Sequence, residues 1–466
     1  MTEAEAANAP EGMQMKDLMQ MPGYKFAIVV SAYDCTGCGS CVNVCPDKVQ
    51  AITMQNFEAN ADEQKYFDYA VTLPDKEDVI EKFKLVSVKG SQFKQPLLEF
   101  SGACGGCGET PYAKLITQLF GERMYIANAT GCSSIWGNSS PSTPYTVNKK
   151  GQGPAWSNSL FEDAAEFGYG MLLAQRAIRD RLKAELDVLA ETANDDVKAA
   201  IAEWNDTFAS GVTNGVATDK LVAALEACGC DKAKEILKEK DYLAKKSQWV
   251  FGGDGWAYDI GFGGVDHILA SGKDINVMVF DTEVYSNTGG QSSKSTPVGA
   301  IAQFAAAGKE TKKKDLAGIA MSYGYVYVAH ISMGADMNQT VKALAEAEAY
   351  PGPSLIIAYA PCINHGIKKG MSKAQTEEKL AVEAGYWHNF RFNPELKLAG
   401  KNAFILDSKE PTGDYQEFLK GENRYASLAK ANPERAAELF ARSEANAKDR
   451  YEHLKKLVTL YAGENA

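Results

Sequence analysis

The chain has 466 residues, of which 45% are hydrophobic and 23% charged, an ordinary composition for a soluble globular protein. This length predicts two or three domains. The formal net charge of -11 argues against nucleic-acid and anionic-membrane partners, and no apolar run reaches the ~18–20 residues that a membrane-spanning helix needs. Residues 1–24 are acidic and rich in Met and Ala, which indicates a leader or linker without a secretory signal and hence a cytoplasmic protein.

A dense cysteine motif dominates residues 25–95, which we interpret as part of a bacterial-ferredoxin-like 4Fe-4S domain followed by a connector. Four cysteines followed by a proline have the spacing C-x2-C-x2-C-x3-C-P, and they are Cys35, Cys38, Cys41 and Cys45. This is the bacterial ferredoxin spacing, whereas a zinc site normally uses two C-x-x-C pairs that lie further apart. The stretches 26–32 and 49–54 on either side are rich in β-forming residues and predict short strands.

The fourth cysteine of this run has two possible roles. In two-cluster ferredoxins the fourth cysteine of each run ligates the other cluster. Cys45 therefore either completes the cluster of its own run or ligates a second cluster, whose companion run is absent from this chain.

From residue 96 the pattern changes to α/β and continues to residue 408. Glycine-rich turns alternate with apolar runs, which predict buried parallel strands at 124–127, 249–251, 275–280, 325–330 and 354–359. Residues 160–246 are rich in Ala, Lys, Glu and Leu with helical periodicity, and we expect a helical insertion there. Residues 409–466, after a Pro/Gly break, predict a charged helical segment that faces solvent.

Two turns in the α/β region have the chemistry of a diphosphate site. Gly253, Asp254 and Gly255 follow one predicted strand, and the oxygen-rich turn 282–287 follows the next. Mg2+ on a diphosphate requires carboxylate and carbonyl oxygens, and flanking glycines let backbone amides approach phosphate at the carboxyl ends of parallel strands. An ordinary βαβ turn with an N-capping Asp is the alternative for an isolated motif of this kind.

The remaining cysteines are scattered. Cys104 and Cys107 form a glycine-rich C-x-x-C, and with Cys132 and Cys362 they give either one four-thiolate site or a redox dithiol. Cys228 and Cys230 are interpreted as incidental, with redox or metal chemistry as the alternative.

Two further polar features have simple interpretations. The basic run 312–314 indicates a solvated loop, with steering of an acidic electron carrier as the alternative. His365 lies near Cys362 but lacks ligand spacing to any other histidine, so we expect it to have a structural role.

These features occur together in one family. From about residue 23 onward the chain resembles the carboxy-terminal part of pyruvate:ferredoxin (flavodoxin) oxidoreductases. The resemblance rests on three long strings: FSGACGGCGETPYAKLITQLFGERMYIANATGCSSIWG at 100–137, GPAWSNSLFEDAAEFGYGM at 153–171, and FGGDGWAYDIGFGGVDHILASGKDINVMVFDTEVYSNTGGQSS at 251–293.

The resemblance implies thiamine diphosphate, Mg2+ and 4Fe-4S clusters as cofactors, and it implies a role for each matching residue. The proximal cluster would be ligated by Cys104, Cys107, Cys132 and Cys362, and the medial-cluster run would be Cys35, Cys38, Cys41 and Cys45. Magnesium ligands would be Asp254, the Thr282 side chain and the Val284 carbonyl, and Asn287 would lie near the reacting carbon as the catalytic residue. Cofactor contacts would come from Glu109, Cys132, Gly253, Asp254, Gly255, Trp256, Thr282, Glu283, Val284, Tyr285, Ser286 and Asn287.

The resemblance also implies an activity. Members decarboxylate pyruvate oxidatively, transfer the acetyl group to coenzyme A, pass electrons to ferredoxin or flavodoxin, and are usually dimers. Single-chain members are much longer, so this chain would supply the diphosphate half of the active site and be inactive without its missing amino-terminal domains or partner subunit.

There are three alternatives to this activity. Another 2-oxoacid could be the substrate, the chain could be an electron-transfer subunit with a vestigial thiamine fold, or it could be a non-oxidative decarboxylase. Retention of Asp254, Thr282 and Asn287 disfavours a vestigial fold, and the cysteines disfavour a non-oxidative enzyme.

Overall fold

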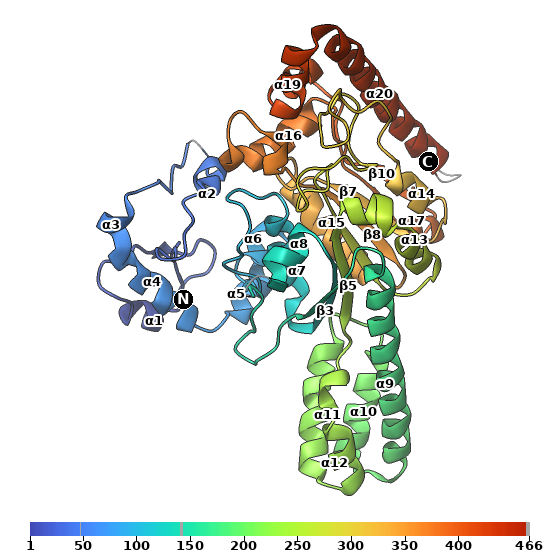
Figure 1. Ribbon diagram of the computed structural model, residues 1–466. Helices are drawn as coiled ribbons and strands as arrows, with labels where there is room; N and C mark the ends of the chain where they lie inside the picture. Colours follow the sequence, from blue (N-terminus) through green and yellow to red (C-terminus); the bar gives the residue numbers. More distant parts are fainter. Residues whose placement is uncertain (47, 140–142, 463–466) are drawn as a thin grey trace.

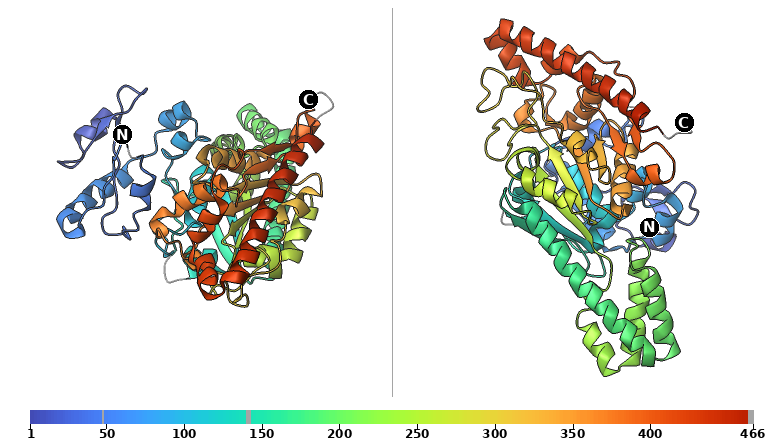
Figure 2. Two further views of the ribbon diagram at one scale, coloured as in Figure 1. Left: turned by 90° about the horizontal axis from the view of Figure 1, so that it is seen from above. Right: turned by 90° about the vertical axis from the view of Figure 1, so that its right-hand side faces the viewer.

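The computed structural model describes residues 1–46, 48–139 and 143–462. Figure 1 shows an amino-terminal unit beside an α/β domain, a helical arm that projects from that domain, and a layer of carboxy-terminal helices. The arm and the last helix lie at opposite ends of the α/β domain in Figure 1 and in the right-hand view of Figure 2.

One mixed sheet organises the α/β domain. In the described residues it has eight strands in the order β10-β9-β7-β8-β6-β5-β3-β4, of which the six from β7 to β4 are parallel. The two short strands at the other edge are antiparallel, β9 to β7 and β10 to β9. The strands are β3 Met124–Ala129, β4 Ala155–Ser159, β5 Ser247–Gly253, β6 Asn276–Asp281, β7 Tyr327–Ile331, β8 Ser354–Tyr359, β9 Phe390–Phe392 and β10 Phe404–Leu406.

The parallel α/β class is confirmed, and each predicted strand is present. The sequence prediction missed β4, β9 and β10. Strand β4 is a half-exposed edge strand with the polar sequence AWSNS, and the other two are three residues long, too short for a periodicity to show.

Both faces of the sheet are covered by helices. In β8, Leu355 and Ile357 pack into one hydrophobic core while Ile356 packs into the other, as alternation along a strand requires. The second core also holds residues of α7 (Thr110–Phe120) and α15 (Met337–Ala349). The first holds residues from the helices on the opposite face, which are α9 Ala164–Thr192, α13 Phe262–Ala270, α14 Leu316–Met321, α16 Ala374–Glu383, α18 Tyr415–Lys420, α19 Asn423–Ala431 and α20 Pro433–Leu460.

The predicted helical insertion is confirmed and forms the projecting arm of Figure 1. Its members are α9, α10 (Asp195–Asp206), α11 (Asn214–Cys228), α12 (Asp231–Leu237) and the short helix η4 (Lys240–Tyr242), after which the chain enters β5. The arm has a hydrophobic core of its own around the fully buried Trp204. It is therefore a packed subdomain on the connection between β4 and β5.

The amino-terminal unit consists of short elements. A small antiparallel pair, β1 with β2, precedes the cysteine run, and a helix inside the run carries Cys41. The predicted strand at 49–54 is wrong, and that at 26–32 is present only at its first residue, because the segments find no strand to pair with in the described residues. The elements are α1 Glu3–Ala7, β1 Lys16–Asp17, β2 Lys25–Phe26, α2 Ser40–Val44, α3 Phe57–Asn60, η1 Ala61–Glu63, α4 Gln64–Thr72, α5 Glu77–Phe83 and α6 Val88–Ser91.

The carboxy-terminal helices are not peripheral. The expectation that residues 409–466 face solvent is wrong for one side of each helix, because Phe418, Tyr425, Leu439 and Leu454 are buried in the core of the sheet. The charged residues between them gave the segment its polar composition. The remaining short elements are η2 Gly121–Arg123, α8 Cys132–Ser134, η3 Ile135–Ser139, η5 Gly255–Ile260, η6 Ile363–His365, η7 Met371–Lys373 and α17 Pro394–Leu398.

None of the helices in the described part of the chain combines the length and apolar character that crossing a membrane requires.

Candidate active site

The carboxyl ends of four adjacent strands carry most of the predicted site residues. In the sheet order β8-β6-β5-β3, Cys362 lies beyond the end of β8, Thr282 follows β6, Asp254 follows β5, and Cys132 lies beyond β3. Parallel strands bring these segments to one edge of the sheet, which is where ligands of open α/β folds bind. The fold therefore brings together segments that are up to 230 positions apart in sequence (from Cys132 to Cys362).

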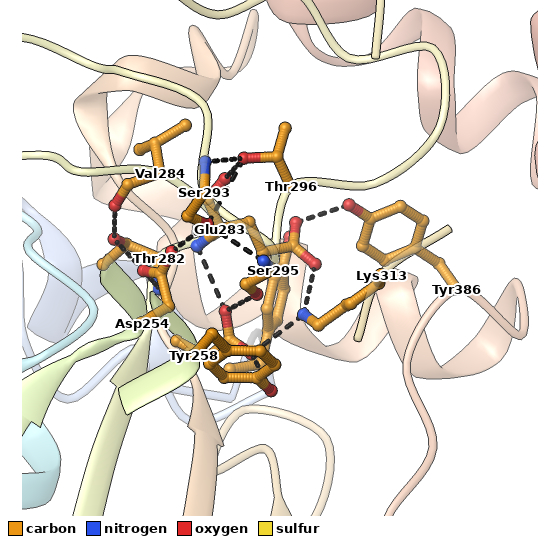
Figure 3. A network of polar contacts seen from close by, with 12 residues as sticks. Asp254, Tyr258, Thr282, Glu283, Val284, Ser293, Ser295, Thr296, Lys313 and Tyr386 are labelled. Carbon is orange, nitrogen blue, oxygen red and sulfur yellow. Dashed lines mark hydrogen bonds and ion pairs between the residues drawn. The ribbon is translucent and has the colours of Figure 1, made fainter. Parts of the chain in front are cut away.

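Three oxygen atoms meet at the ends of β5 and β6. Thr282 Oγ1 lies 3.0 Å from Asp254 Oδ1 and 3.0 Å from the Val284 carbonyl oxygen. The Thr282 amide also donates to Asp254 Oδ1 at 3.1 Å. Figure 3 shows the three residues side by side. All three are nearly or completely buried.

This oxygen set fits Mg2+. Octahedral Mg2+ holds its oxygens at about 2.1 Å, which places neighbouring ligands about 3.0 Å apart. The two oxygen separations centred on Thr282 have that value. Burial raises the pKa of Asp254 well above its usual range, and the nearby Asp281 raises it further. A bound cation would offset both effects, because opposite charge favours the ionised carboxylate.

The residues next to Asp254 include a glycine with open space beside it and an indole N–H without an acceptor, and both could serve a ligand. A Cβ on Gly253 would meet only the Phe280 carbonyl, at 3.8 Å, so this position is open. At Gly255 a Cβ would lie 2.4 Å from the Tyr285 ring, so only glycine fits there. The Trp256 indole is fully buried, yet its Nε1 finds no hydrogen-bond acceptor among the described residues. A buried N–H without a partner is costly and is a feature that a ligand can satisfy.

Ser293 is a site residue that the sequence prediction missed. Its hydroxyl donates to Asp254 Oδ2 at 2.6 Å, on the oxygen that Thr282 does not contact. The signal was present in the Ser- and Thr-rich run 292–296, which follows the second glycine turn.

The turn 282–287 points its side chains in different directions. Val284 is buried beside Thr282, whereas Ser286 Oγ lies 3.3 Å from the Cys132 sulfur. Tyr285 is fixed by its backbone, which pairs with Gln291. Asn287, the predicted catalytic residue, is exposed at the tip of the turn. The turn 282–287 therefore contacts the oxygen set at Thr282 and Val284 and contacts Cys132 at Ser286.

Glu283 does not face the oxygen set, although it was predicted to contact the cofactor. Its carboxylate accepts from Lys313 at 2.9 Å and from Tyr386 at 2.5 Å (Figure 3), and from Arg424 at 2.8 Å. Burial opposes its ionisation, but Lys313 and Arg424 outweigh that effect and lower the pKa of Glu283 to about 2. Its φ of +60° is unusual for a residue with a side chain.

Lys313 is not in a solvated loop, which corrects the expectation for the run 312–314. Its ammonium lies 2.8 Å from Asp281 and 2.9 Å from Glu283, and its pKa is raised because these carboxylates outweigh burial. Lys314 contacts the ring of Phe262 and donates to the Tyr258 carbonyl, and Lys312 is exposed. A solvated loop is typical of three consecutive lysines, but here the partners of Lys313 and Lys314 come from segments that are distant in sequence.

His365 has the structural position expected for it. The ring is fully buried, and its Nε2 lies 2.7 Å from the Thr282 carbonyl oxygen. Its Nδ1 faces the buried Glu422, which in turn accepts from Arg424 at 2.7 Å. The turn 282–287 is therefore supported from behind by His365 and from its side by the ion pairs of Glu283.

The loop that carries Cys104 and Cys107 contacts the segment that carries Cys362, and Cys132 begins helix α8. Gly108, at the end of the C-x-x-C loop, donates its amide to the Pro361 carbonyl at 3.0 Å, and a Cβ there would lie 2.5 Å from the Pro361 nitrogen. Burial raises the pKa of Cys132 to about 12 and that of Cys362 to about 11, and the charge of nearby Glu109 adds to both. Buried thiolates here need compensating positive charge, which iron would supply.

Glu109 lies at the start of α7, beneath this loop. Its Oε2 accepts from the Trp136 indole at 2.7 Å, and burial raises its pKa to about 7. Within residues 1–46, 48–139 and 143–462, no group of three or more His, Cys, Asp and Glu side chains is gathered closely enough to hold a single metal ion. A 4Fe-4S cubane distributes its thiolates over four irons, so both predicted cysteine sets remain predictions.

The first cysteine run contacts the second. A Cβ on Gly105, inside the C-x-x-C loop, would lie 3.2 Å from the Cys38 Cβ, and helix α2 packs on η7 and α16. Burial raises the pKa of Cys38, but its hydrogen bonds with Ser40, Thr36 and Gly106 outweigh this and lower it. Cys35 and Cys41 are exposed, and Cys45 is partly buried with its sulfur accepting from the Ala51 amide. The two cysteine motifs therefore lie side by side.

Comparisons with known families match two regions of the chain. The family described as thiamine pyrophosphate enzyme, C-terminal TPP binding domain, matches residues 227–358, which include the Asp254–Val284 oxygen set. The family described as 4Fe-4S binding domain matches residues 28–49, which include the first cysteine run. The predicted classes of these two regions are thus confirmed.

Several curated proteins are similar over nearly the whole chain. A pyruvate-flavodoxin oxidoreductase of Enterobacter agglomerans and a pyruvate:ferredoxin oxidoreductase of Moorella thermoacetica are each 57% identical over 98% of this chain. A mitochondrial pyruvate dehydrogenase [NADP(+)] of Euglena gracilis is 47% identical over 98% of it. The chain spans 39% of the length of the first two proteins and 25% of the third.

A solved 2-oxoglutarate:ferredoxin oxidoreductase from Magnetococcus marinus aligns with 57% of this chain and 65% of its own, at 14% identity and a TM-score of 0.33, which is too low to carry an argument. In sequence the chain is similar to a part, about two fifths in length, of pyruvate:ferredoxin and pyruvate-flavodoxin oxidoreductases.

Proposed function

We propose that this chain supplies the diphosphate-binding half of the active site, and the proximal iron–sulfur cluster, of an enzyme that oxidises pyruvate. In that reaction pyruvate, coenzyme A and two oxidised one-electron carriers give acetyl-coenzyme A, CO2, one proton and two reduced carriers. The acceptor would be ferredoxin or flavodoxin, as in the names of the relatives. The observation that carries the proposal is the buried Asp254–Thr282–Val284 oxygen set at the edge of the sheet, beside the cysteine loops.

Each part of the chain has a role in this proposal. Asp254, the Thr282 hydroxyl and the Val284 carbonyl would hold Mg2+, and Gly253 leaves space beside them for the diphosphate. The unpartnered Trp256 Nε1 would donate to the bound cofactor. When bound, thiamine diphosphate supplies a carbanion for addition to the 2-oxo carbon, and a 4Fe-4S cluster accepts single electrons. Asn287, exposed on the turn that carries these ligands, is in a position to meet a substrate that enters from solvent.

The cysteines would form the electron path. Cys132 touches Ser286 of the cofactor turn, so a proximal cluster on Cys104, Cys107, Cys132 and Cys362 would be next to the thiamine site. The contact between Cys38 and the Gly105 loop would place the medial cluster next in line. Figure 1 shows the amino-terminal unit, which carries the first cysteine run, beside the α/β domain.

The rest of the enzyme would come from sequence outside this chain. We propose that it carries the other half of the thiamine site, the coenzyme A contacts and the companion cysteine run for Cys45, and that the whole enzyme is a dimer. The exposed apolar residues of the amino-terminal unit fit a covering partner. Among them are Ile28, Val30, Tyr33 and Val49, which are 48–67% exposed.

A chimera tests the proposal directly. The matching 39% of the Enterobacter agglomerans relative is replaced by this chain, and coenzyme-A-dependent reduction of an electron-accepting dye by pyruvate is measured anaerobically. We expect activity from the chimera, none from the chain alone, and none from a chimera with Asp254→Asn. A soluble chimera that binds clusters but is inactive with pyruvate and other 2-oxoacids would overturn the proposal. A chain that oxidises pyruvate alone would refute the claim that it is half of a site.

A further inference from the structure

Two cysteines far from the cofactor region contact each other in the helical arm. Cys228 is the last residue of α11, Cys230 immediately precedes α12, and their sulfur atoms are 3.0 Å apart. Gly229, between them, has φ +61° and donates its amide to the Leu225 carbonyl. This left-handed turn is a common way to end a helix, and a glycine adopts it without strain. It reverses the chain so that both sulfurs come together.

We propose that Cys228 and Cys230 are a redox-active dithiol that forms a reversible disulfide by exchange with low-molecular-weight disulfides of the glutathione class. A disulfide bond is about 2.05 Å long, so the two sulfurs need to approach by about 1 Å. The turn at Gly229 already provides the close approach, and small side-chain rotations provide the remainder. The site requires neither thiamine nor an iron–sulfur cluster.

The hydrogen bond between the sulfurs assigns their roles. Cys228 donates to Cys230, and this bond, together with one from the Ala233 amide, lowers the pKa of Cys230. The thiolate is the attacking form in disulfide exchange. Cys230 is therefore the attacking thiol and Cys228 the resolving thiol.

The exchange balances without a further reagent. The Cys230 thiolate attacks one sulfur of the small disulfide, forms a mixed disulfide and releases one small thiolate. Cys228 then loses its proton to water and attacks the Cys230 sulfur, which breaks the mixed disulfide and releases the second small thiolate. In total the protein loses two electrons and two protons, one proton when Cys230 ionises and one from Cys228, and the two small thiolates take up two protons from water to become thiols.

The surroundings favour this chemistry over metal binding. Zinc sites use three or four protein side chains. In the parts of the chain that the structure describes, no third His, Cys, Asp or Glu joins the pair at metal-binding distance. Both cysteines are partly buried at the margin of the core of the arm, so a small disulfide can reach them while their backbone stays fixed.

Trypsin isolates the pair for measurement. Cleavage after Lys220 and Lys232 gives the peptide 221–232, which contains both cysteines and none of the other eight. The reduced, cluster-loaded chain is equilibrated anaerobically with mixtures of reduced and oxidised glutathione, quenched in acid, alkylated and digested. We expect the peptide to lose two hydrogen masses and to escape alkylation. The equilibrium constant for the folded chain should exceed that for the chain unfolded in urea about tenfold or more, because the fold holds the sulfurs together.

Single substitutions separate the two roles. With Cys228→Ser, Cys230 should keep one bound glutathione, because no resolving thiol remains. With Cys230→Ser, Cys228 should acquire glutathione more slowly, because it lacks the hydrogen bonds that Cys230 accepts. The proposal is overturned if the unsubstituted peptide stays fully alkylated in every mixture, if it accumulates glutathione adducts in place of the disulfide, or if the disulfide forms equally well in urea.

Discussion

Replacing Lys313 by Met tests whether buried charges behind the site stabilise it. Lys313 is the partner of two buried carboxylates, Asp281 at 2.8 Å and Glu283 at 2.9 Å. Glu283 keeps Arg424 at 2.8 Å after the change, whereas Asp281 retains only neutral donors, among them Tyr258 and Ser295. The substitution therefore leaves one buried carboxylate, and not two, without a cation.

The loss of stability expected for Lys313→Met follows from the single carboxylate, Asp281, that it leaves without a cation. Removing one partner of a buried pair costs about 3–5 kcal/mol. Because Lys313 retains 25% of its side-chain exposure, we expect the lower end, about 3 kcal/mol, for Lys313→Met. Lys313→Met combined with Asp281→Asn removes both charges and should cost less than the sum of the single substitutions by about 2 kcal/mol.

The assay is urea unfolding of the chain, followed by circular dichroism at constant pH. Lys312→Met is the matched control, because its side chain is exposed and we expect a change within about 0.5 kcal/mol. The reasoning fails if Lys313→Met and Lys312→Met have the same effect, or if the double substitution is additive. Calorimetry on the same variants should show weaker Mg2+-dependent thiamine diphosphate binding for Lys313→Met only.

Two of the three further predictions concern the site, and the third concerns the buried Glu378 on α16. Asp254→Asn should abolish Mg2+-dependent thiamine diphosphate binding in calorimetry. The urea midpoint of the cofactor-free chain should stay unchanged or rise. The control is Asp259→Asn, which removes an ion pair with Lys294 and should leave thiamine diphosphate binding normal. Cys362→Ser should lower iron and acid-labile sulfide by one cluster, about four atoms of each per chain, whereas a normal iron content would refute its role as a ligand. Burial raises the pKa of Glu378 from 4.5 to about 8, so its contribution to stability is full below pH 4.5 and is lost as the pH rises to about 8. Glu378→Gln should remove this dependence of stability on pH, which amounts to about 1.4 kcal/mol per pH unit. If the urea midpoints of the unsubstituted and Glu378→Gln chains change in parallel from pH 5 to about pH 8, the prediction is wrong.

Local sequence patterns were sufficient for the parts of the molecule that follow local rules. The buried strands are visible as apolar runs, and the glycine-flanked Asp254 follows from what Mg2+ and phosphate require. The cysteine spacing likewise identifies the first iron–sulfur motif without knowledge of the fold. The residues that make up each of these patterns lie within a few positions of one another in the sequence.

The remaining features depend on contacts between distant segments. Lys313 is one of three consecutive lysines, and nothing near it in sequence indicates that it is buried between Asp281 and Glu283. Arg424, 141 positions from Glu283, belongs to a segment whose composition is typical of a solvent-facing helix. Strand β4 is formed by polar residues that pair with β3 at the edge of the sheet. Pairing and burial of this kind are set by the tertiary structure, which overrides local propensity.

These distant contacts explain why a glutamate occurs inside the turn 282–287 although it faces away from the oxygen set. A positive φ at Glu283 costs about 1–2 kcal/mol, and it persists only where the surroundings enforce it. Arg424 and Tyr386 hold the carboxylate of Glu283 from one side, and its own amide donates to Asp281 from the other. With Glu283 fixed, the residues before and after it present the Thr282 hydroxyl and the Val284 carbonyl to the same point. Because Arg424 lies on α19, the carboxy-terminal helices are part of the support of the site.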